Sequence, residues 1–87
     1  MRILALRNIT REEGFIYYRR NFRCDALIEM GGGTLETPVE FCIESNPLGI
    51  KTLEIQLSSA LNYPVLPVKK ALTAYILAED DAGKLPL

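Results

Sequence analysis

Two runs of alternating side chains, joined by three glycines at residues 31–33, constrain the fold of this chain most. The first run is FIYYRRNFRCDALIEM at residues 15–30, and the second is LETPVEFCIE at residues 35–44. Side chains on a strand alternate between two faces, and the apolar residues of each run fall mainly on one face. The pattern therefore predicts a β-hairpin that turns at the glycines.

Two registers of this hairpin keep the apolar faces together. A two-residue loop at residues 31–32 sets Arg19 and Arg23 opposite glutamates, whereas a four-residue loop sets Asp25 opposite Glu40. Opposite charges across a strand pair favour a register by roughly 0.2–1 kcal/mol, and like charges oppose it. Paired glycines also suit the positive φ angles of a tight turn. We therefore predict the two-residue loop.

Turn and periodicity signals place the remaining elements. Pro47 and Gly49 suit a hairpin turn. Pro64 and Pro67 are tolerated only near a helix start, and apolar residues then recur at helical spacing until Gly83. These signals predict an α+β fold, a four-stranded antiparallel meander with one C-terminal helix on one face. The expected strands lie at about residues 2–10, 15–30, 33–45 and 50–58, and the helix at about 66–80.

Length and composition favour one ordinary globular domain over residues 1–87. The apolar fraction of 48% and the charged fraction of 24% argue against a disordered chain. No apolar run approaches the roughly 18 residues that a membrane-spanning helix needs. The apolar stretch at residues 3–6 is too short for the core of a signal peptide. We therefore expect a cytoplasmic protein without a membrane partner.

The register of the first hairpin stays open, because its loop can hold three or four residues. With three, Leu4 and Leu6 face the core while Ile3 and Ile9 face outward; with four, the two sets exchange. Both registers leave apolar side chains on the outer face, beside the aromatic residues that open the second strand. We expect an apolar outer face in either case.

Four residues on this outer face form the candidate interface: Phe15, Tyr17, Arg19 and Arg23. A single helix covers only one side of a sheet, so the other side meets a partner or solvent. Apolar patches with aromatic and arginine side chains mark protein interfaces. We therefore expect a protein-interaction module that forms a homo-oligomer or binds a protein partner through this face, unless the C-terminal tail covers it.

The same four residues allow a second hypothesis, a single-stranded nucleic-acid-binding module. Such proteins stack bases on aromatic rings and hold phosphates with arginines. The net charge of −1 supplies no overall attraction for phosphate, and glutamates share the outer face. Nucleic acid is therefore the less favoured partner.

Residues suited to catalysis or metal binding are scarce in the sequence. There is no histidine, which removes the commonest general base and metal ligand. Cys24 and Cys42 fall on opposite faces of the predicted sheet, so they can form neither a disulfide nor a zinc site. We expect free thiols, no metal, no cofactor and no enzymatic activity.

Two adjacent lysines, Lys69 and Lys70, lie near the start of the predicted helix. Unpaired N–H groups and the helix dipole favour anions at a helix N-terminus. The lysines are therefore a candidate anion contact, and the alternative is a solvated helix face.

Overall fold

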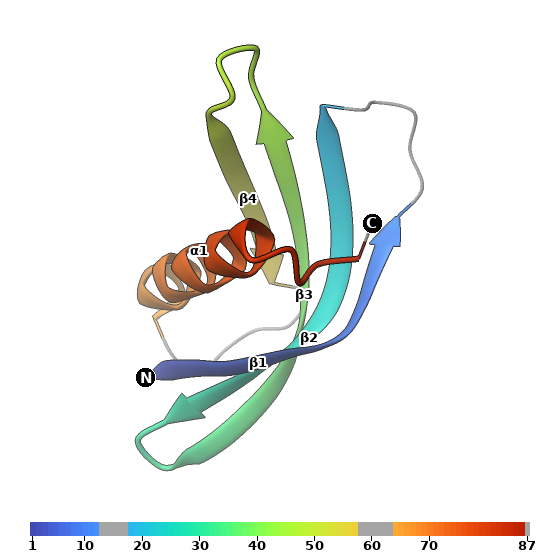
Figure 1. Cartoon of the computed structure of the whole chain (residues 1–87). Coiled ribbons are helices and arrows are strands. Elements are labelled where there is room, and N and C mark those ends of the chain that lie inside the picture. The colour runs from blue at the N-terminus through green and yellow to red at the C-terminus, as the bar shows by residue number, and fades with distance from the viewer. Residues whose placement is uncertain (13–17, 58–63, 87) are drawn as a thin grey trace.

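The computed structural model describes residues 1–12, 18–57 and 64–86. Four antiparallel strands form one sheet in the order β1-β2-β3-β4, and a helix follows β4 (Figure 1). The elements are β1 (Arg2–Glu12), β2 (Arg19–Met30), β3 (Gly33–Ser45), β4 (Lys51–Leu57) and α1 (Val65–Asp81). The predicted α+β meander with one C-terminal helix is confirmed.

The hairpin between β2 and β3 has the predicted two-residue loop. Met30 pairs with Gly33, and the register continues without a shift to the pair of Arg19 and Glu44. Gly33 has a φ of 145°, a conformation that favours glycine. Arg23 pairs with a glutamate as expected, so cross-strand charge identified the register.

The turn between β3 and β4 also follows the prediction. The N–H of Asn46 donates to the carbonyl of Ile50 at 3.0 Å, which leaves three residues in the loop. Gly49 has a φ of 81°, and its N–H donates to the carbonyl of Asn46 at 2.9 Å. The Asn46 side chain accepts two further backbone N–H groups, from Leu48 and Ile50, each at 2.9 Å.

The first hairpin differs from both predicted registers. Strand β1 extends to Glu12, which pairs with Asn21, and β2 begins at Arg19; residues 15–17 lie outside the described residues. The β1–β2 pairing shifts twice, between residues 3 and 5 and between residues 7 and 10. Each β-bulge adds a residue and restarts the alternation of side chains.

The two shifts bring the apolar residues of β1 onto the core face. Ile3 is buried in the core, and Leu6 and Ile9 pack against it. The expectation that Leu6 or the Ile3/Ile9 pair would face outward is wrong, because it assumed uninterrupted alternation. Asn8 has a φ of 54° at the second shift, and asparagine tolerates this conformation better than most residues.

The core lies between the sheet and α1. Phe22 and Phe41 stack at its centre with ring centroids 4.9 Å apart. The predicted apolar stripe of α1 is confirmed, and its buried residues are Val68, Leu72 and Ile76. Helix α1 approaches the two edge strands, β1 and β4, so the sheet curves around it.

The C-terminal tail extends the cover that α1 gives the core. Gly83, with a φ of 71°, and Lys84 donate backbone hydrogen bonds to the carbonyls of Asp80 and Glu79 and end the helix. The tail then crosses β3 and β2 on the helix side of the sheet (Figure 1). Leu85 is buried in the same core, so the described tail leaves the outer face uncovered.

Candidate functional site

The outer face of the sheet carries mostly charged side chains. Of the predicted interface, Arg19 and Arg23 lie here, whereas Phe15 and Tyr17 fall outside the described residues. Ion pairs connect neighbouring strands across this face: Arg2–Glu29, Arg7–Glu36, Arg19–Glu44, Arg23–Glu12 and Arg23–Glu40. Where the structure describes it, the outer face is therefore a network of ion pairs and not an apolar patch.

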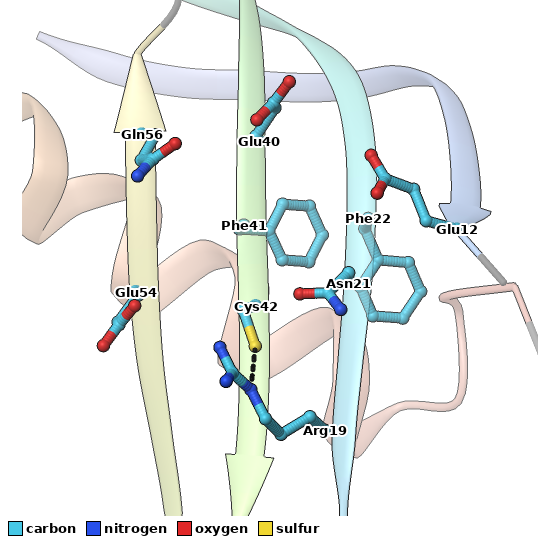
Figure 2. A pocket seen from close by; sticks show the side chains of 9 residues that line it. All are labelled: Glu12, Arg19, Asn21, Phe22, Glu40, Phe41, Cys42, Glu54 and Gln56. Atoms are coloured by element: carbon cyan, nitrogen blue, oxygen red, sulfur yellow. Dashed lines mark hydrogen bonds between the residues drawn. The ribbon is translucent and has the colours of Figure 1, made fainter. Parts of the chain in front are cut away.

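A depression of about 150 Å³ on the outer face contains Arg19 (Figure 2). The Nε of Arg19 donates a hydrogen bond to the Sγ of Cys42 at 3.5 Å. The carboxylates of Glu12, Glu40 and Glu54 border the same depression. Three carboxylates beside one guanidinium favour neither a phosphate nor a nucleic-acid strand at this position.

A charged cluster joins the C-terminal end of α1 to the sheet. Asp80 accepts hydrogen bonds from Arg20 of β2, at 2.8 and 3.0 Å, and from Lys51 of β4, at 2.6 Å. Hydrogen bonding from Arg20, assisted by Lys51, lowers the pKa of Asp80 to about 2. Lys51 also contacts Asp81 at 2.9 Å. Every member of the cluster has a partner, so its function is structural.

A groove of about 600 Å³ lies between strand β4 and helix α1. Leu53 and Ile55 line it from β4, and one face of α1 supplies the opposite wall. The helix residues of this wall recur at intervals of three and four: Leu66, Lys69, Lys70 and Thr73. Leu66 is 66% exposed, so a large apolar side chain meets solvent beside the groove.

The two lysines of the groove have no ion-pair partner among the described residues. Most other basic side chains of the structure lie within 4.0 Å of a carboxylate, as do those of Arg2, Lys51 and Lys84. Lys69 and Lys70 lie beyond the first turn of α1 and face β4 rather than the helix N-terminus. They remain a candidate anion contact, at the groove.

The edge of β4 presents backbone groups that β3 does not use. The register between β3 and β4 is unbroken from the turn, where Asn46 hydrogen-bonds Ile50, to the end of β4. Antiparallel ladders alternate between pairs that exchange hydrogen bonds and pairs that do not. The N–H and C=O groups of Leu53 and Ile55 therefore point away from β3, toward the free edge beside the groove.

The opposite edge of the sheet is less suited to pairing. Strand β1 contains two register shifts and the left-handed Asn8, and irregularities of this kind protect an edge from further strands. Strand β4 is regular and has no described neighbour beyond β3. Of the two edges, β4 is the better template for an added strand.

Residues 1–80 match the sequence model of one protein family. The chain belongs to the BB_0187 family. The match includes all four strands and α1 as far as Asp80, so both walls of the groove lie within it. No curated protein and no solved structure matches the chain.

Two further findings describe this member of the family. Among its described residues, α1 is the only helix, and it falls short of the length and apolarity that crossing a bilayer requires. No group of three or more acidic or cysteine side chains in the described ranges could hold a metal ion.

The sequence indicated the two lysines but not the groove that they line. Leu66, Lys70 and Thr73 were recognisable as one helix face, yet the strand opposite this face depends on how α1 docks. The charged cluster was also missed, although a signal existed. Arg20 shares the inward parity of Phe22, and Asp80 continues the spacing of Leu72 and Ile76.

Proposed function

We propose that this protein is a non-enzymatic protein-interaction module, in which β4 receives an extended segment of a partner protein as a fifth strand. The observation that carries the proposal is the free edge at Leu53 and Ile55, beside the open groove. In strand addition, main-chain hydrogen bonds supply affinity, and alternate side chains of the added strand enter pockets that supply specificity. An edge strand facing a helix across a groove provides both.

The apolar groove walls support this function. Leu53, Ile55 and Leu66 give an added strand apolar surface to bury at roughly 25 cal/mol per Å². Two free thiols, at Cys24 and Cys42, support a reducing, cytoplasmic setting for the module. The absence of histidine from the chain supports a non-enzymatic function.

Nucleic-acid binding through the outer face has weaker support. Arg19 and Arg23 are already paired with glutamates, and a phosphate would have to displace those carboxylates. The remaining carboxylates of the face would repel the nucleic acid. We therefore place the interaction site at the β4 edge.

The experiment is a selection of random heptapeptides displayed on phage against the whole protein. Selected peptides should lack proline and alternate apolar with other residues, because proline removes a strand N–H. They should bind Leu53→Pro at least about tenfold more weakly than Leu53→Thr, since only the proline removes the N–H at the edge. Peptides that bind both variants equally, or a selection without enrichment, would overturn the proposal.

A further inference from the structure

We infer that the segment received by β4 is acidic on the side that faces the groove, and that it comes from another protein rather than from a second copy of this chain. This inference rests on the proposed function and specifies the partner. It follows from the charges around the groove.

The groove-facing side of an added strand would lie against α1. Every second side chain of that strand would point toward the wall formed by Leu66, Lys69, Lys70 and Thr73. Neither lysine has a carboxylate partner among the described residues. An aspartate or glutamate at a groove-facing position would supply that partner, and the neighbouring groove-facing positions would place apolar side chains against Leu53 and Ile55.

The other side of the added strand would lie beside the outer face. There β4 presents Thr52, Glu54 and Gln56. A second acidic side chain on this side would meet Glu54, and like charges on neighbouring strands are destabilising. The partner sequence therefore alternates, with acidic and apolar residues toward the groove and neutral or basic residues on the opposite side.

A second copy of the chain fits this edge poorly. Antiparallel pairing of two β4 strands about a two-fold axis places both α1 helices on the same side of the joined sheet. Lys69 and Lys70 of each copy would then face those of the other across one merged groove. In the register centred on Glu54, the two copies of that carboxylate would also lie opposite each other. Both arrangements are repulsive.

The test uses two capped synthetic peptides that differ at one position, Thr-Val-Thr-Glu-Thr-Val-Thr and Thr-Val-Thr-Lys-Thr-Val-Thr. Each sequence is a palindrome, so parallel and antiparallel addition present the same side chains in the same order. Binding to the isotope-labelled protein is measured from NMR chemical shifts. We expect the glutamate peptide to bind at least about fivefold more tightly than the lysine peptide, because the groove lysines attract its carboxylate and repel the ammonium group.

Two variants locate the charge effect. Lys70→Glu should weaken the glutamate peptide about fivefold and strengthen the lysine peptide. Arg11→Glu makes the same charge change on the β1 edge, at another side chain without a described ion-pair partner, and should leave both affinities unchanged. Equal weakening by both variants would reveal only a net-charge effect and would overturn the inference.

The remaining outcomes separate the partner class from the function. If both peptides bind at the β4 edge with equal affinity, the acidic preference is wrong and strand addition stands. If neither peptide binds, strand addition and the partner class both fail. A dimer in light scattering at micromolar concentration that Lys70→Glu strengthens would identify a second copy as the occupant and contradict the assignment to another protein.

Discussion

Arg20 of β2 and Asp80 of α1 are joined by two parallel hydrogen bonds, of 2.8 and 3.0 Å. The Asp80 side chain is only 7% exposed, and Lys51 of β4 approaches it at 2.6 Å from another strand. Bidentate arginine–carboxylate pairs combine strength with a fixed geometry. This pair therefore holds one end of α1 against the sheet, and with it the helix wall of the groove.

Replacing Asp80 with asparagine should destabilise the fold. Arg20 and Lys51 would lose their shared carboxylate, and hydrogen bonds to charged groups contribute about 1.5–3 kcal/mol each before relaxation. We expect Asp80→Asn to lower the free energy of unfolding by about 2 kcal/mol, measured by urea denaturation. Asp81→Asn removes a carboxylate that is 73% exposed and should change it by less than about 0.5 kcal/mol. Equal losses in the two variants would refute the special position of Asp80.

The stability of the protein should fall in acid through the same carboxylate. Arg20, assisted by Lys51, holds the pKa of Asp80 at about 2, below its ordinary value of 3.8. A pKa that is lower in the folded state contributes stability above the unfolded-state value, and this contribution is lost as the pH falls through the folded-state value. We expect the unfolding free energies of wild type and Asp80→Asn to converge by about 2 kcal/mol between pH 5 and pH 2. A constant difference would contradict the lowered pKa.

Local sequence signals predicted two of the three hairpins, because glycine and proline geometry determines a turn within a few residues. Gly33 and Gly49 occupy the conformations for which they were identified. The first hairpin was not predictable in this way. Its two bulges place Ile3, Leu6 and Ile9 on one face, and their positions depend on packing against the core.

Leu85 should contribute to stability although it lies in the tail. It is 7% exposed and belongs to the core beside α1. Leu85→Ala should lower the free energy of unfolding by about 2 kcal/mol, at the low end for buried leucines because a tail can relax. Leu48→Ala, at a leucine that is 83% exposed, is the matched control and should change it by less than about 0.5 kcal/mol. Equal effects would show that the tail does not pack in the core.

The two cysteines should differ in reactivity toward iodoacetamide. Cys24 is buried in the core, and burial raises the pKa of its thiol to about 11. Cys42 lies on the outer face in the depression beside Arg19. At pH 8 the native protein should take one label, at Cys42, and the urea-denatured protein two, as determined by mass spectrometry. Rapid double labelling of the native protein would contradict the burial of Cys24.

The groove could not be predicted from sequence, since a free edge and an opposing helix meet only after the sheet has curved. Lys69 and Lys70 were identified as an anion contact at a helix start. The structure places them along the groove instead, facing Leu53 and Ile55. Their chemistry was evident from sequence, whereas their surroundings depended on the docking of α1.

Amide hydrogen exchange at the β4 edge tests strand addition most directly. It is followed by NMR with and without saturating glutamate peptide. The N–H groups of Leu53 and Ile55 point away from β3, so we predict that their exchange slows at least about tenfold on binding. The amides of Glu54 and Gln56, which already bond to β3, should change much less. Bound peptide with unchanged exchange at Leu53 and Ile55 would contradict the addition of a fifth strand.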